Sequence, residues 1–555
     1  MDACGLPIPA ELWGRILHHV PWPRRVHLRD LSRAWRDALD ASAWWWRDAP
    51  LREGFAECCE RGALAAAQWL AAAGCLGLAD ARIEDNYALR RACAGGHLAV
   101  AQWLAAAFGL GPADARSRDN EALRWACDGG HLVVAQWLAA AFGLGPADAR
   151  SSDNAALRWA CENGHLAVAQ WLADTFGLGP ADARAEDNEA LRCACENGHL
   201  AVVQWLANRF GLGAADARAR DNKALRWACG AGRLEVAQWL AATFGLGPAD
   251  ARAGDDNALH AACENGHLAV AQWLVALSGL GPADVGADEK ILLLRQACQG
   301  GSLEAVQWLT DAFAIGGADV GDNGCMYALA TASAGGRLEI AQWLVARFGL
   351  GPADDTARAL TNYALSQACY NGHLAIVQWL VATFSLGSAD IRVDDDRALR
   401  YVCRHGHLNV VQWLVTTFGL GVDVIRAADM LDIACSYGHL GLAQWLAATF
   451  GLTATDVRNL DNPVLRTICA LGFLPMGQWL VSRFRLTAAD ARTHDNAALI
   501  AACVNGRLEM ARWLVDTFGL TVADARSGDN SALRGARQYG RHRVVQWLGV
   551  RFGLA

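Results

Sequence analysis

The tripeptide Gln-Trp-Leu recurs along the chain and constrains its fold more than any other feature. Successive Trp residues of this motif lie 34 residues apart for six steps, and then 35, 35, 36, 34, 32, 34, 34 and 34 residues apart. Self-similarity at such a period marks a stacked repeat array. The sequence therefore predicts 15 units over residues 51–555 and a separate segment over residues 1–50. The Trp positions are 69, 103, 137, 171, 205, 239, 273, 308, 343, 379, 413, 445, 479, 513 and 547.

Hydrophobic residues make up 53% of the chain, but they occur in short segments that recur with the repeat period. The longest stretch without a charged residue, 92–113, contains two adjacent glycines and a proline, so it predicts two helices and a turn rather than a membrane span. Glu11 and Arg15 stand where a signal peptide needs an apolar run. The net charge is −8 with both signs mixed, whereas nucleic-acid binders carry a basic face. We expect neither a membrane nor a nucleic-acid partner.

Cysteine usage points to a reducing compartment. Of the 18 cysteines, 13 occupy one slot, ten residues before the repeat Trp. Equivalent positions on stacked helices lie about 8–10 Å apart, which exceeds the limit of roughly 7 Å between Cα atoms for a disulfide. The sequence predicts small buried thiols and a cytoplasmic chain.

The segment before the array has two short helical faces separated by Pro21 and Pro23. About 40 residues cannot bury this much apolar surface alone, so the segment is expected to need a partner. The first face comprises Leu12, Ile16 and Leu17, and the second comprises Leu28, Leu31 and Trp35.

This segment resembles an F-box in its Pro-x-Glu-Leu opening at 9–12 and its Leu-x-x-Leu-Ser-Arg-x-Trp-Arg run at 28–36. It departs from the common pattern at Ile8, at Leu31 and at the basic pair 24–25. F-boxes dock onto the Skp adaptor of cullin–RING ubiquitin ligases, so the resemblance implies the same partner here. The alternative is a helical hairpin that only caps the first repeat. The residues that the resemblance places against the adaptor are Pro9, Leu12, Ile16, Leu28, Leu31 and Trp35.

One repeat, residues 119–138, shows the pattern of two helices. Asp119 or Asn120 is expected to cap the first helix, and the glycine pair 129–130 is expected to end it. Each helix has an apolar face that it cannot hide alone, so neighbouring units must stack. The first face consists of Leu123, Ala126 and Cys127, and the second of Leu132, Val134, Ala135, Trp137 and Leu138.

The unit resembles the ankyrin repeat in Ala-Leu-Arg-x-Ala-Cys, Asn-Gly-His-Leu and Val-x-Gln-Trp-Leu. The Thr-Pro of the family's usual Thr-Pro-Leu-His start is missing, and only Leu259-His260 keeps the His. The connection instead carries Gly-Pro-Ala-Asp-Ala-Arg, or Thr487-x-x-Asp490, which favours a short helical turn over a projecting β-hairpin. The expected fold is an all-α, ankyrin-like solenoid with reduced fingers.

Two recurring constellations have competing interpretations. Cys127 and His131 have a spacing similar to a zinc site, but each unit offers two ligands where a structural zinc takes four. We expect the His to hydrogen-bond a neighbouring backbone. The rows that contain Asp114 and Arg116 are interpreted as inter-repeat ion pairs rather than as a binding surface. No catalytic set departs from the repeat pattern, so we expect a non-enzyme without metal or cofactor.

The target is expected to dock on the first-helix face of the first half of the array. Here one slot varies and carries three Trp residues in four consecutive units, and Trp often dominates binding energy. The alternative is that these rings only pack between adjacent units. Irregular spacing also predicts disturbed stacking, a hinge, over residues 279–368. The predicted target-binding residues are Glu121, Trp125, Trp159, Trp227 and Tyr401.

The resemblances together imply a substrate-recruiting subunit of a cullin–RING ubiquitin ligase, monomeric apart from its partners. The F-box-like segment would hold the Skp adaptor, and the array would hold an unknown target protein. The same pairing resembles proteins of large amoeba-infecting viruses and some protists, where it would redirect ubiquitination in the host cytoplasm. The alternative is an interaction scaffold without a role in ubiquitination.

Overall fold

The computed structural model describes residues 51–73, 76–351, 355–458 and 463–554. Within these ranges every element is a helix, and no strand is present. The predicted all-α repeat fold is therefore confirmed, and so is the replacement of the β-hairpin by a helical turn. The F-box-like segment, with Pro9, Leu12, Ile16, Leu28, Leu31 and Trp35, lies outside the described residues.

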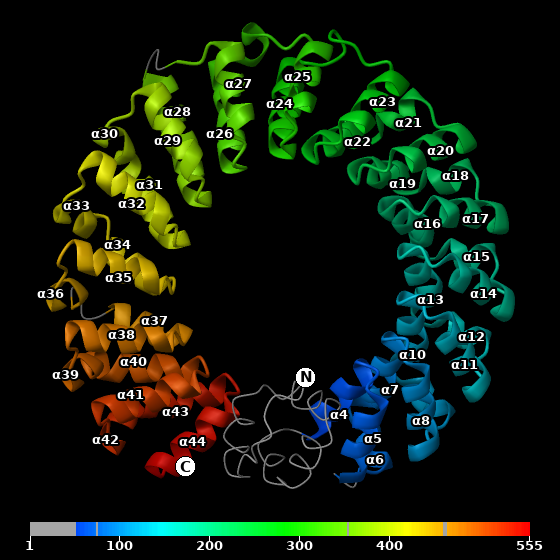
Figure 1. The fold of residues 1–555 in the computed structure, drawn as a ribbon, viewed down its shortest axis with the longest axis horizontal. Helices are drawn as coiled ribbons and strands as arrows, with labels where there is room; N and C mark the ends of the chain where they lie inside the picture. The colour runs from blue at the N-terminus through cyan, green and yellow to red at the C-terminus, as the bar shows by residue number, and fades with distance from the viewer. Residues whose placement is uncertain (1–50, 74–75, 352–354, 459–462, 555) are drawn as a thin grey trace, which may run out of the picture. The chain divides into compact units, whose positions relative to one another are not determined.

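The array forms two compact units, which divide between Leu280 and Gly281. Within each unit a repeat consists of an inner helix, which packs on the inner helices of its neighbours, and an outer helix, which carries the Trp (Figure 1). Most repeats also have a short connector helix. The inner helices of the first unit are α4 (Leu51–Glu60), α7 (Ile83–Ala94), α10 (Ser117–Asp128), α13 (Ser151–Glu162), α16 (Ala185–Asn197), α19 (Ala219–Gly230) and α22 (Ala253–Glu264). The outer helices are α5 (Leu64–Ala73), α8 (Leu98–Phe108), α11 (Leu132–Phe142), α14 (Leu166–Phe176), α17 (Leu200–Phe210), α20 (Leu234–Phe244) and α23 (Leu268–Ser278). The connectors are α6 (Leu78–Ala81), α9 (Pro112–Ala115), α12 (Pro146–Ala149), α15 (Pro180–Ala183), α18 (Ala214–Ala217) and α21 (Pro248–Ala251).

The second unit repeats this order with local changes. Its inner helices are α24 (Ala287–Gly300), α26 (Gly317–Ala334), α28 (Asp355–Asn371), α31 (Val393–His405), α34 (Met430–Ser436), α37 (Pro463–Leu471), α40 (Thr493–Val504) and α43 (Ser527–Gln538). The outer helices are α25 (Leu303–Ala312), α27 (Leu338–Phe348), α29 (Leu374–Phe384), α32 (Leu408–Phe418), α35 (Leu440–Thr449), α38 (Leu474–Phe484), α41 (Leu508–Phe518) and α44 (His542–Phe552). The connectors are α30 (Ser388–Ile391), α33 (Val422–Ala427), α36 (Ala454–Val457), α39 (Ala488–Ala491) and α42 (Val522–Ala525).

The core follows the predicted apolar faces. Leu123 and Cys127 of α10 and Leu138 of α11 are fully buried. On the outer helix Trp137 packs edge-to-face on Phe142, with ring centroids 5.5 Å apart. The Cys127 thiol is therefore buried, as the sequence predicts, and its burial raises the pKa of the thiol.

The connector helices are stabilised as their sequences indicate. In α9 the Asp114 carboxylate accepts a hydrogen bond from the Gly111 N–H at 2.8 Å, and proline occupies the first turn. In α39 the Asp490 carboxylate accepts hydrogen bonds from both the backbone and the hydroxyl of Thr487. An acid at the third position thus caps both of these short helices, as the sequence predicts.

The start of the inner helix differs from the prediction. Arg118, Asp119 and Asn120 have left-handed backbone angles, with φ of 49°, 54° and 60°, so Asp119 and Asn120 form a left-handed turn instead of a cap. Asp and Asn tolerate this conformation better than other side chains. The Asn120 side chain instead hydrogen-bonds Asp148 of the next repeat.

The stretch with irregular spacing has a different local structure. The inner helix α24 has no left-handed turn, and residues 281–286 form turns where other repeats have a connector helix. The following inner helices α26 and α28 extend to 18 and 17 residues, against 12 in α10. Altered local structure over 279–368 is thus present, while a hinge there stays a prediction.

Candidate protein-binding surface

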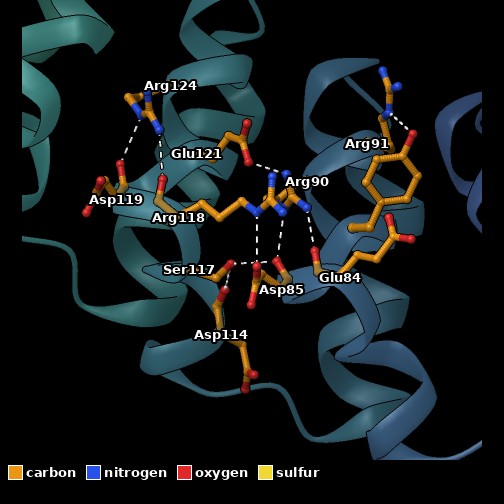
Figure 2. Close-up of polar contacts among 11 residues, drawn as sticks. Glu84, Asp85, Arg90, Arg91, Asp114, Ser117, Arg118, Asp119, Glu121 and Arg124 are labelled. Atoms are coloured by element: carbon orange, nitrogen blue, oxygen red, sulfur yellow. Dashed lines mark hydrogen bonds and ion pairs between the residues drawn. The ribbon is translucent and has the colours of Figure 1, made fainter. Parts of the chain in front are cut away.

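An arginine on each of the inner helices α7, α10, α13, α16 and α19 folds back onto the left-handed turn that precedes it. In α10, Arg124 donates from Nε to the Asp119 carbonyl at 2.9 Å and from Nη2 to the Arg118 carbonyl at 2.7 Å (Figure 2). Arg158 makes the equivalent bonds in α13. The guanidinium therefore donates hydrogen bonds to the carbonyls of the left-handed turn.

The arginine at this position also forms an ion pair with the next repeat. Arg90 of α7 is buried, donates to the Asp85 carbonyl at 2.9 Å and forms an ion pair with Glu121 of α10 (Figure 2). Arg158 pairs with Glu189 in the same way. Burial lowers the pKa of Arg90, and the neighbouring Glu121 carboxylate opposes that effect. Glu121 is therefore part of an inter-repeat ion pair.

The predicted Trp row is half-buried and lies against arginines of the preceding repeats. The Trp125 ring has the Arg90 guanidinium carbon 5.3 Å from its centroid, and Trp159 has that of Arg124 at 5.2 Å. Trp227 packs in the same way on an arginine of α16, at 5.4 Å. Cation–π contacts of this kind fix the rings. The rings thus pack between repeats while each keeps an exposed part.

Tyr401 belongs to the second unit, whereas the other predicted target-binding residues belong to the first. Its ring packs edge-to-face on Tyr370 at 5.3 Å, and Arg397 donates to its hydroxyl at 3.1 Å. Sequence reasoning missed the surrounding cluster. Six of the seven tyrosines of the chain lie in this unit, namely Tyr327, Tyr363, Tyr370, Tyr401, Tyr437 and Tyr539.

The aspartate and arginine rows join consecutive repeats. Arg116 of one connector donates from Nε and Nη2 to the two oxygens of Asp148 in the next, at 2.8 and 3.0 Å. The same pairing continues in the second unit, where hydrogen bonds from Arg492 lower the pKa of Asp524 to about 2. The interpretation of these rows as inter-repeat ion pairs is confirmed.

Sequence comparison decides the family. A model of the family described as ankyrin repeats in three copies matches residues 142–221, 211–288, 294–391, 329–428 and 365–458. Together these matches cover more than half of the chain. The chain belongs to the ankyrin-repeat family. Ankyrin-repeat solenoids are typically non-enzymatic scaffolds that bind protein partners.

The other comparisons add little. No curated protein matches the chain. Among solved structures, the pentatricopeptide repeat protein PPR10 from maize matches at 12% identity with a TM-score of 0.21, over 99% of this chain and 94% of that chain. Across the part of the chain that the structure describes, no helix is both long and apolar enough to cross a membrane.

The histidines of these ankyrin repeats are engaged by backbone groups. His131 Nε2 lies 3.0 Å from the carbonyl oxygen of Ala94 in the preceding repeat. Arg233 takes the same place in a later repeat and donates to the Glu196 carbonyl at 3.1 Å. The predicted role of His in bonding a neighbouring backbone is confirmed. Within the described ranges no three His, Cys, Asp or Glu side chains gather as metal ligands would.

A cavity of about 260 Å³ lies in the repeat with the shortest spacing, beside α34. This repeat is two residues shorter than the regular one, and Asp432 replaces the arginine found at position 124. The Asp432 Oδ1 atom is buried without a hydrogen-bond partner. Burial, and to a smaller extent the charge of Asp429, raise the pKa of Asp432.

We expect Asp432→Asn to stabilise the chain at neutral pH. An acid whose pKa is raised on folding binds more protons in the folded state, so its contribution to stability falls as pH rises from its unfolded value through its folded value. The gain from the amide should therefore be larger at pH 7 than at pH 4, measured by urea unfolding. Asp423→Asn, at an exposed carboxylate of the same repeat, is the control. An equal gain at both pH values would contradict the role of ionisation.

Proposed function

We propose that the chain is a substrate-recruiting adaptor of a cullin–RING ubiquitin ligase. The F-box-like segment, through Pro9, Leu12 and Trp35, binds the Skp adaptor, and the inner-helix face of the first unit binds the target. The observation that supports target binding is the row of half-buried Trp rings held by arginines of the preceding repeats, and the F-box resemblance of the N-terminal segment supports the ligase role. Rings fixed in place lose little conformational entropy when a partner covers their exposed part, which suits a binding surface.

The same arginine contacts make the row rigid. Arg90 and Arg124 are each hydrogen-bonded to carbonyls of a left-handed turn. The Trp rings therefore pack on guanidinium groups that are themselves fixed in position. A rigid surface that presents aromatic side chains can bind one partner while the N-terminal segment holds another. Delivery of a target to a ligase requires both at once.

We expect Leu12→Asp to abolish binding to the Skp adaptor and to leave the array folded. A buried leucine contributes about 1.5–3 kcal/mol through its area, and burying a carboxylate adds a desolvation cost. The measurement is adaptor binding to the full chain by calorimetry, with circular dichroism as the check on helicity. Leu64→Asp, in the first outer helix of the array, should not affect adaptor binding and controls for a general effect of the substitution.

The second candidate is an ankyrin scaffold that binds its target without ubiquitination, with the N-terminal segment as a cap. Absence of adaptor binding to the wild-type chain at micromolar concentration would favour this candidate and remove the ligase proposal. Target capture that depends on the inner-helix face would then remain as the function.

A further inference from the structure

Three carboxylates stand in the last turn of consecutive inner helices of the first unit. Asp128 ends α10, Glu162 ends α13, and Glu196 lies near the end of α16. Asp128 and Glu162 each follow the row Trp of their helix, Trp125 or Trp159, by three residues. Residues three apart are neighbours on a helix surface, so acid and ring share one face.

Helix stability does not account for these acids. A negative charge near the C-terminus of a helix is disfavoured by the helix dipole. The three charges also act on one another, because burial and then the charges of Asp128 and Glu196 raise the pKa of Glu162. Among the described residues, none of the three carboxylates forms an ion pair with a lysine or arginine, and Asp128 accepts one hydrogen bond, from the Asn163 side chain at 2.8 Å.

The fold does not require an acid at this position either. In the second unit the same place at the end of each inner helix never carries an acid, although these inner helices also stack on their neighbours. The residues there are Gln299, Ala334, Tyr370, Arg404, Ser436, Ala470, Val504 and Gln538.

Some other acids of the first unit are paired within the array. Asp148 is paired with Arg116, and Glu121 is paired with Arg90. The three acids Asp128, Glu162 and Glu196 have no such partner among the described residues, and Asp128 and Glu196 are exposed while Glu162 is half-buried. This surface therefore carries three carboxylates without an ion-pair partner among the described residues, next to aromatic rings.

We propose that the inner-helix face from α10 to α16 binds a segment of the target that carries arginine or lysine at every third position. The carboxylates complement its positive charges, and the exposed parts of Trp125 and Trp159 pack on its side chains. Packed helices are about 8–10 Å apart, and three residues of extended chain span about 10 Å, so successive basic residues meet successive helices. The inference rests on the proposed docking of the target on this face.

The test uses the full chain and a fluorescein-labelled nonapeptide of glycine with arginine at every third position. We expect saturable binding by fluorescence anisotropy, weakened at least about tenfold in the variant Asp128→Asn/Glu162→Gln/Glu196→Gln. The control variant is Asp153→Asn/Asp174→Asn/Glu235→Gln, which removes the same charge from exposed sites outside the inner-helix ends and should bind normally. Circular dichroism checks that both variants are folded.

Two more arms sharpen the result. A peptide of the same composition with its three arginines adjacent should bind more weakly, because only one helix end can hold them. Trp125→Ala/Trp159→Ala should also weaken binding of the spaced peptide. Equal loss of binding in the acid variant and its control, or no preference for the spaced peptide, would overturn the proposal in favour of general electrostatic attraction.

Adaptor binding to the same proteins separates the two proposals. The acid variant should bind the Skp adaptor as the wild type does while it loses the peptide. Peptide binding that depends on the three acids, in a chain that binds no adaptor, would refute the ligase function and leave this inference standing. Adaptor binding without acid-dependent peptide binding would refute only this inference.

Discussion

Gly96→Ala should destabilise the array more than Gly109→Ala does, although both glycines have left-handed backbones with φ of 72° and 62°. A left-handed alanine costs about 1–2 kcal/mol at either position. At Gly96 the added Cβ would also lie 2.5 Å from Nδ1 of His131 in the next repeat, whereas at Gly109 nothing lies within 4 Å. The His131 ring must then move away from the Ala94 carbonyl that it bonds at 3.0 Å.

The excess loss at Gly96 should be about 2–3 kcal/mol, from overpacking and from the lost hydrogen bond. Urea unfolding of the two variants measures it. In a His131→Ala background the clash is gone, so the two glycine substitutions should then cost the same. An equal cost in the presence of His131 would show that the close approach between repeats is not what requires the glycine.

The repeat fold could be predicted from the sequence because the same residues face the core in every unit. Leu123, Cys127 and Leu138 are buried as their helical spacing predicts. The hydrogen bond of His131 to a neighbouring backbone and the pairing of Arg116 with Asp148 were also predicted. These features depend only on the stacking of equivalent positions.

The left-handed turn at 118–120 could not be predicted from one sequence. Asp and Asn favour both helix caps and left-handed conformations, so Asp119-Asn120 fits either. In α10 Arg124 donates to two carbonyls of the turn, whereas α40 has the same turn with Ile500 at the equivalent position. A helical pattern places Arg124 on a face of α10, but it does not show that the side chain returns to the preceding turn.

The contacts of the Trp row could not be predicted from the spacing of residues either, for a related reason. Trp125 contacts Arg90, which is 35 residues earlier, and this contact depends on the offset between neighbouring helices. Spacing within one helix could separate the Trp face from the core face, but it left open whether the rings are exposed or packed. Spacing also places Asp128 on the face of Trp125, but Glu162 and Glu196, at the same place in the next two helices, were missed because only the Trp slot was compared between repeats.

Arg90→Met should cost about 3–5 kcal/mol of the free energy of unfolding, as removal of one partner from a buried ion pair does. The side chain of Arg90 is only 2% exposed, and the change would leave Glu121 without its partner. It would also remove the Arg90 donor from the Glu84 carbonyl and leave the Asp85 carbonyl with the Ser117 hydroxyl alone (Figure 2). Methionine fills much of the same volume, so the loss reflects the polar contacts rather than a cavity.

Arg118→Met is the matched control for this prediction. Arg118 also pairs with Asp85, at 3.0 Å, but its side chain is 54% exposed and that of Asp85 is 61% exposed. An exposed pair contributes at most about 1 kcal/mol, so urea unfolding should barely distinguish this variant from the wild type. In a double-mutant cycle, Glu121→Gln should recover part of the loss in Arg90→Met, because a neutral amide is easier to leave unpaired than a carboxylate. Similar losses of unfolding free energy for Arg90→Met and Arg118→Met would mean that burial adds nothing to the inter-repeat ion pair. Arg90 could then not be what holds the Trp125 ring in place.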